Sequence, residues 1–286
     1  MNVTAQMVKE LRDKTGAGMM DAKKALVEVD GDMEKAAEIL RQKGIASAEK
    51  KMGRIAAEGR VDSYVDDSCG AMIEINCETD FVAKNDEFKT LTSNMAKHVA
   101  DLNPADVDAF LNSTCPSCQK LIGDALKEKI ASIGEKITVR RFVRYEGAVA
   151  SYIHNGKIGV LLSADKNDAE LLNDICLHIA SSAPKFVSRE EIPQSVIDEE
   201  TRIEMGKEDL LNKPENIRAK IVEGRVNKLM AERCLLEQPF VKDPNVTVGQ
   251  LIEGKLTIKA FTRWELGEGL EKRQDNFAEE VMGQLG

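Results

Sequence analysis

Apolar residues recur with helical spacing over the first 44 residues and predict three short helices. The first helix begins after Thr4 as its N-cap and stops before Gly16, and Asp30-Gly31 forms the turn before the third. Gly44 is predicted to end the third helix, and a Lys- and Ala-rich connector follows it. Because the apolar residues are mainly Ala and Met, we expect a weakly stable bundle that gains stability by docking on another surface.

From residue 59 the apolar spacing becomes that of strands, and the pattern occurs twice. Residues 59–65 (GRVDSYV) match residues 147–153 (GAVASYI) at the Gly, Val, Ser and Tyr positions. A second strand and then a helix follow in each copy, at 70–75 and 159–164 for the strands. The repetition predicts two related α+β units, each a hairpin followed by a helix.

The first copy is longer than the second between its second strand and its helix. The first copy has 28 positions from Gly70 to His98, whereas the second has 19 from Gly159 to His178. The surplus of about nine residues falls on the segment 79–85, TDFVAKN.

The residues of this extra segment allow two interpretations. In the first, which the chemistry alone favours, Thr79 caps a short helix, Asp80 complements its positive end and Phe81 packs into the core. In the second, the insertion lies on the surface and Phe81, between Asp80 and Lys84, is an anchor for a partner.

The rest of the chain continues with alternating helix and strand signals. They comprise a helix over 119–132, a strand over 137–145, helices over 195–212 and 215–236, a strand over 256–261, and a last helix with Phe277, Val281 and Leu285. The two polar helices are separated by Lys213-Pro214 and predict an antiparallel helical arm.

Composition excludes several classes of protein. The net charge of -9 and an aromatic content of 4% argue against nucleic acid as a partner. No apolar run approaches the roughly 20 residues that cross a membrane, and the N-terminus lacks the features of a signal peptide. Six cysteines are too few for a disulfide scaffold. We expect a cytoplasmic protein that does not bind a membrane.

Candidate chemistry is sparse. Cys115 and Cys118 have the spacing of a redox dithiol or half of a zinc site, but they fall in a loop between two predicted helices. We interpret them as incidental thiols and keep a thiol redox protein as the alternative function. His98 and His178 hold equivalent places in the two copies, which favours packing, and His154 lies in an exposed hairpin turn. No catalytic motif is present, so we expect neither an enzyme nor a bound metal or cofactor.

Two segments resemble signature motifs of the bacterial elongation factor Ts family. They are residues 15–26, TGAGMMDAKKAL, and residues 74–84, EINCETDFVAK. The similarity spans essentially the whole chain, including the arm and residues 265–269, ELGEG. Ala22 is a minor departure, because some relatives have Cys at this position.

The resemblance implies an α+β fold with a UBA-like N-terminal module of three helices and a duplicated core. It implies these domains: the module over 1–54, core subdomains over 55–140 and 141–265, an arm over about 184–234 within the second, and a C-terminal helical module over 266–286.

The resemblance also implies a guanine-nucleotide exchange factor that binds elongation factor Tu, both GDP-bound and nucleotide-free, and promotes GDP release without bond-making chemistry. The implied residues that displace the partner's Mg²⁺ are Thr79, Asp80, Phe81 and Val82, and those that contact the partner are Met19, Met20, Lys23 and His154. Within this set Phe81 is the apolar wedge and Asp80 disturbs the ligands of the ion. A homodimer or a 2:2 complex, and the role of the arm, are left open.

Overall fold

A computed structural model describes residues 3–211 and 213–271 of the chain. The described residues divide into two compact units: unit 1 comprises 3–62, 73–142 and 265–271, and unit 2 comprises 63–72 and 143–264. The predicted α+β class is confirmed, because three helices precede a core of sheets and helices. The predicted domain boundaries remain predictions.

The chain begins with a bundle of α1 (Ala5–Thr15), α2 (Met19–Glu28) and α3 (Met33–Lys51). The predicted cap is confirmed, because Oγ1 of Thr4 accepts a hydrogen bond from the backbone N–H of Met7 at 3.2 Å. The core cluster shared by these helices comprises the buried side chains Val8, Leu11, Ala22, Ala25, Leu26 and Ala36. Three of these six are alanines, so the bundle buries little apolar surface.

The predicted end of the third helix at Gly44 is wrong, because α3 continues through this residue to Lys51. A Cβ atom at position 44 would lie 2.9 Å from the Cβ of Ala131 on α7 (Ile122–Ile133). The glycine therefore marks a close approach of two helices and not a helix end.

The predicted duplication of a hairpin and a helix is confirmed. The copies are β1 (Glu58–Val65), β2 (Cys69–Cys77) and α5 (Asp86–Leu102), and β4 (Ala148–His154), β5 (Ile158–Ala164) and α8 (Ala169–Ser182). In the second copy β4 and β5 pair antiparallel, with His154 opposite Ile158 at the turn. The equivalent Ser63 and Ser151 hydrogen bond to each other through their hydroxyls at 3.0 Å.

In the described ranges, 3–211 and 213–271, the strands form three sheets. The first has the order β1-β2-β3 with β3 at Thr138–Glu146, the second β4-β5-β8 with β8 at Ile258–Glu265, and the third joins β6 (Pro239–Phe240) to β7 (Asp243–Thr247). The remaining short helices are α4 (Asp80–Lys84), α6 (Val107–Leu111), α12 (Val248–Ile252), η1 (Arg189–Glu191) and η2 (Leu235–Glu237). Strand β2 is central in its sheet and is buried along its whole length.

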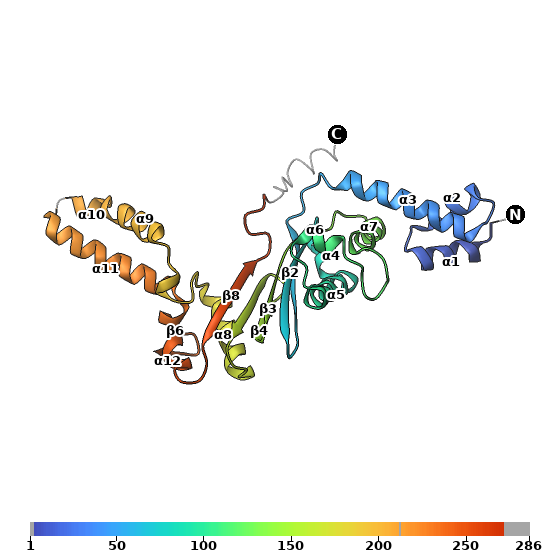
Figure 1. Cartoon of the computed structure of the whole chain (residues 1–286). Helices are drawn as coiled ribbons and strands as arrows, with labels where there is room; N and C mark the ends of the chain where they lie inside the picture. The colour runs from blue at the N-terminus through green and yellow to red at the C-terminus, as the bar shows by residue number, and fades with distance from the viewer. Residues whose placement is uncertain (1–2, 212, 272–286) are drawn as a thin grey trace. The chain divides into compact units, whose positions relative to one another are not determined.

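The predicted helical arm is confirmed within unit 2 by α9 (Gln194–Met205), α10 (Glu208–Leu211) and α11 (Glu215–Arg233). Helices α9 and α11 pack side by side and run antiparallel (Figure 1). Their shared core includes Val222, Val226 and Met230 from α11. Among the described residues no helix combines the length and apolar character needed to cross a membrane. The predicted last helix, with Phe277, Val281 and Leu285, lies outside the described residues.

Two equivalent glycines of the repeat provide a matched test of the fold. Gly59 has φ +139°, and a Cβ there would lie 2.2 Å from the carbonyl oxygen of Ile75, whereas Gly147 has φ +86° and open space around it. We expect Gly59→Ala to lower the free energy of unfolding by about 3 kcal/mol, because strain and a backbone clash add. Gly147→Ala should cost about 1 kcal/mol, from its positive φ alone. Urea denaturation of both variants measures the difference, and equal losses would contradict this account.

Candidate functional site

The extra segment of the first repeat forms the short helix α4 directly after β2. Oγ1 of Thr79, the N-cap, accepts a hydrogen bond from the backbone N–H of Val82 at 3.3 Å. At the other end, Asn85 closes α4 and caps α5, because its side chain accepts from the backbone N–H of Glu87 at 2.8 Å. The predicted cap at Thr79 is therefore confirmed, and two consecutive caps define the segment.

Phe81 on α4 points into solvent, with 83% of its surface exposed. The interpretation that packed Phe81 into the core is wrong, because the buried residue of this helix is Ala83. A five-residue helix has one face toward the protein, and Phe81 lies on the other. The structure thus places a large apolar side chain at the exposed tip of a capped insertion.

Asp80 and Lys84 flank Phe81 and pair with each other across one turn of α4. Nζ of Lys84 donates to the Asp80 carboxylate at 2.6 Å, and this hydrogen bond and the nearby charge raise the pKa of Lys84. Both side chains are exposed, so the pair adds little to stability and keeps charge beside the apolar ring.

The other predicted site residues lie on two further elements. Met19 and Met20 occupy the first turn of α2 with 48% and 63% of their surfaces exposed, and Lys23 is exposed beyond them. His154 ends β4 as an exposed residue, and its Nδ1 lies 3.1 Å from the hydroxyl of Tyr152. These residues and α4 are thus surface features on three different elements.

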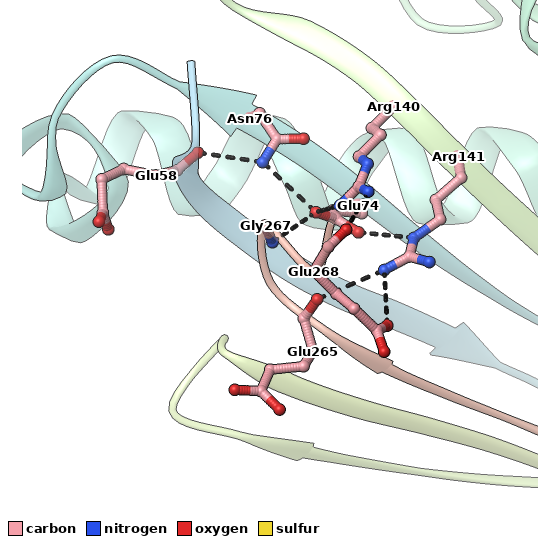
Figure 2. Close-up of polar contacts among 8 residues, drawn as sticks. All are labelled: Glu58, Glu74, Asn76, Arg140, Arg141, Glu265, Gly267 and Glu268. Carbon is pink, nitrogen blue, oxygen red and sulfur yellow. Dashed lines mark hydrogen bonds and ion pairs between the residues drawn. The ribbon is translucent and has the colours of Figure 1, made fainter. Parts of the chain in front are cut away.

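A buried ion cluster is centred on Glu74 of β2, six positions before α4 begins at Asp80. The carboxylate of Glu74 has no exposed surface and accepts hydrogen bonds from Nη1 of Arg140 at 2.9 Å and Nε of Arg141 at 2.6 Å (Figure 2). The backbone N–H of Gly267 donates to the same carboxylate at 2.9 Å, and the Asn76 amide donates at 3.3 Å.

The same two arginines also hold the segment that follows β8. Arg140 donates to the carbonyl of Glu268, and Arg141 donates to the carbonyl of Glu265 at 3.3 Å (Figure 2). Burial alone would raise the pKa of Glu74, but the hydrogen bond from Gly267 and the two guanidinium groups leave this pKa below its ordinary value. Glu74 is therefore a fully compensated buried anion that joins β2, β3 and residues 265–268.

The two thiols of the CxxC sequence lie, as predicted, in the loop between α6 and α7. Cys115 is buried, Cys118 is exposed, and both are free. Burial would raise the pKa of Cys115, but hydrogen bonds from Ser117 and Cys118 lower it to about 7. Nε2 of His98 lies 3.6 Å from the Cys115 sulfur. In the part of the chain that the structure describes, no three His, Cys, Asp or Glu side chains gather as a metal site.

Comparison with known proteins identifies the family. The family model described as "Elongation factor TS" matches residues 78–268, which begins just before Thr79 and ends at Glu268. The chain belongs to the elongation factor Ts family. Proteins named elongation factor Ts from Thioalkalivibrio sulfidiphilus and Halothermothrix orenii are each 47% identical to it and cover 99% and 100% of the chain and 99% of their own lengths. The corresponding protein of Alkalilimnicola ehrlichii is 45% identical over 99% of both chains. The protein is thus a translation elongation factor of the elongation factor Ts type.

Two acidic residues around the elongation factor Ts motif were not predicted from the sequence. Glu135, in the loop between α7 and β3, contacts Thr79 and is 56 positions away from it. No periodic signal links residues at that distance. Glu74 did leave a signal, because it is the one charged residue of the strand β2.

We expect Glu74→Gln to lower the free energy of unfolding by about 3 kcal/mol, because it leaves two partly buried guanidinium groups without their anion. Because the folded-state pKa of Glu74 is lowered, its contribution is complete above the unfolded-state pKa and is lost as the pH falls through the folded-state value. Wild type should therefore lose more stability than the variant on acidification below about pH 4. Urea denaturation at several pH values tests this, and parallel pH profiles would refute it.

Alkylation of Cys115 by iodoacetamide should reach half of its maximal rate near pH 7, because the thiolate is the reactive form. Cys118 is an internal control in the same loop, since its hydrogen bond to Cys115 raises its pKa. Tandem mass spectrometry separates the two sites. Ser117→Ala should move the Cys115 profile to higher pH, and a profile already centred above about pH 8.5 in wild type would contradict the assignment.

Proposed function

We propose that the chain binds elongation factor Tu and accelerates release of its GDP, acting as a guanine-nucleotide exchange factor without making or breaking a covalent bond. Membership of the elongation factor Ts family supports this role. The structural observation that carries it is Phe81, a highly exposed aromatic side chain on a helix capped at both ends.

In the proposed complex Phe81 inserts between side chains of the partner near its Mg²⁺ site. Mg²⁺ requires near-ideal octahedral geometry, so small displacements of its surroundings weaken its hold on the nucleotide. Asp80 enters beside the ring as a carboxylate already paired with Lys84, and it disturbs the water and ligand network of the ion. Thr79 and Val82 shape the start of the helix that presents both residues.

The burial energy of one Phe side chain limits how much of the acceleration of GDP release Phe81 can supply. Burying one Phe side chain is worth about 1.5–3 kcal/mol, and every ~1.4 kcal/mol of differential stabilisation is about tenfold in rate. Phe81 thus contributes about one to two orders of magnitude if its burial favours the nucleotide-free partner.

The remaining effect comes, in this proposal, from contacts elsewhere on the chain. Met19, Met20 and Lys23 on α2 and His154 at the β4–β5 turn are exposed and available for this role. Linkage requires that GDP weaken binding of the exchange factor by the same factor by which the exchange factor weakens binding of GDP.

Phe81→Ala should reduce the acceleration of GDP release by about 10- to 100-fold, because it removes the burial energy of the ring. Stopped-flow release of fluorescent GDP from elongation factor Tu measures the rate, and circular dichroism establishes that the variant is folded. Val241→Ala truncates another exposed apolar residue and should leave the rate unchanged. Unchanged release with the Phe81 variant would exclude the wedge, and no acceleration by wild type would exclude the exchange function.

A further inference from the structure

Helix α4 cannot hold Phe81 in place by its own stability. It has five residues, whereas isolated helices shorter than about 12–15 residues are marginal in water. Phe81 is exposed and so gives the helix no packing energy, and Ala83 is its one buried residue. The direction of the Phe81 side chain therefore depends on contacts between the ends of α4 and other parts of the protein.

Glu135 supplies such a contact at the N-terminal end. Its carboxylate accepts hydrogen bonds from the backbone N–H of Glu78 at 3.1 Å, from that of Thr79 at 3.0 Å and from the Thr79 hydroxyl at 2.6 Å. The hydroxyl that donates to Glu135 is the same one that accepts from Val82 as the helix cap. Its proton is thus directed to Glu135, which leaves an oxygen lone pair for the N–H of Val82.

A second carboxylate makes the contact reciprocal. The side chain of Glu78 accepts from the backbone N–H of Lys136 at 2.6 Å, so each of the two loops binds the backbone of the other. Arg54 pairs with the Glu78 carboxylate at 3.2 Å, and Nζ of Lys136 donates to the carbonyl of Arg54 at 2.8 Å. We call this set of Arg54, Glu78, Thr79, Glu135 and Lys136 the acidic brace.

We propose that Glu135 is a positioning residue for nucleotide exchange: it fixes the first turn of α4 so that Phe81 meets the partner already ordered. This inference rests on the proposed exchange function. Ordering the backbone of a residue costs conformational entropy. A helix that is already ordered in the free protein loses little further entropy when it binds. Charge-assisted hydrogen bonds are the stronger ones, so a carboxylate at position 135 holds the turn better than an amide.

Glu135→Gln should loosen the turn, because an amide replaces the carboxylate that accepts the charge-assisted hydrogen bonds. The acceleration of GDP release should fall about tenfold, which corresponds to the free energy of such a bond. Glu128→Gln on the neighbouring α7 removes the same charge from ion pairs with Lys120 and Arg41 and serves as the matched control, with release unchanged. Thr79→Val removes the hydroxyl from the other side of the contact and should also slow release. Circular dichroism establishes that each variant is folded.

A double-mutant cycle with Phe81→Ala separates positioning from general structural damage. If Glu135 acts through the wedge, Glu135→Gln has no further effect on GDP release in the Phe81→Ala background. Full additivity of the two losses would overturn the proposal, because the carboxylate would then act independently of Phe81.

Amide hydrogen exchange supplies a readout that does not depend on the partner. Glu135→Gln should speed exchange of the amides of residues 78–85 at least tenfold, whereas Phe81→Ala should leave them protected. Unchanged protection in Glu135→Gln would overturn the brace, and faster amide exchange with normal GDP release would overturn its role in positioning. If wild type fails to accelerate GDP release, the exchange function falls, while the amide measurement still decides whether the brace exists.

Discussion

The buried carboxylate of Glu74 is the constraint on which the arrangement of unit 1 depends. A charge without exposed surface is tolerated only where partners replace the water it has lost. Arg140, Arg141 and the backbone N–H of Gly267 supply that replacement from two other segments of the chain. Any shift of β3 or of residues 265–268 away from β2 would leave both the anion and its cations uncompensated, so these three parts of unit 1 are fixed together.

The acidic brace holds the proposed site in a similar way, through carboxylates that accept hydrogen bonds from another segment of the chain. Glu74 lies on β2 and contacts arginines on β3, while Glu135 lies just before β3 and contacts Thr79 just after β2. Carboxylates thus join the neighbouring strands β2 and β3 at two places. The donors to Glu74 lie on β3, and the donors to Glu135 lie just after β2. The end of β2 is held firmly by these contacts, and a five-residue helix that starts there inherits its orientation from them.

Local signals in the sequence predicted the helices, the duplicated hairpins and the cap at Thr79, because periodicity and capping act over a few residues. The predictions failed where contacts between residues far apart in the sequence determine the structure. Gly44 has the local signal of a helix end, but its role is set by Ala131 on another helix. Phe81 has the composition of a core residue, and its exposure depends on which face of α4 the rest of unit 1 covers. Glu135 and Thr79 are joined only by the fold.

A wedge for another protein must be exposed and ordered at once, and these requirements oppose each other. Exposure removes the burial energy that orders most aromatic side chains, so order has to come from polar contacts made beside the ring. Caps at Thr79 and Asn85 and the carboxylate of Glu135 provide it without covering Phe81. Asp80 and Lys84 keep charge next to the ring. In the proposed role, the extra residues of the first repeat form a five-residue helix that keeps Phe81 exposed, and its stability comes from the surrounding scaffold.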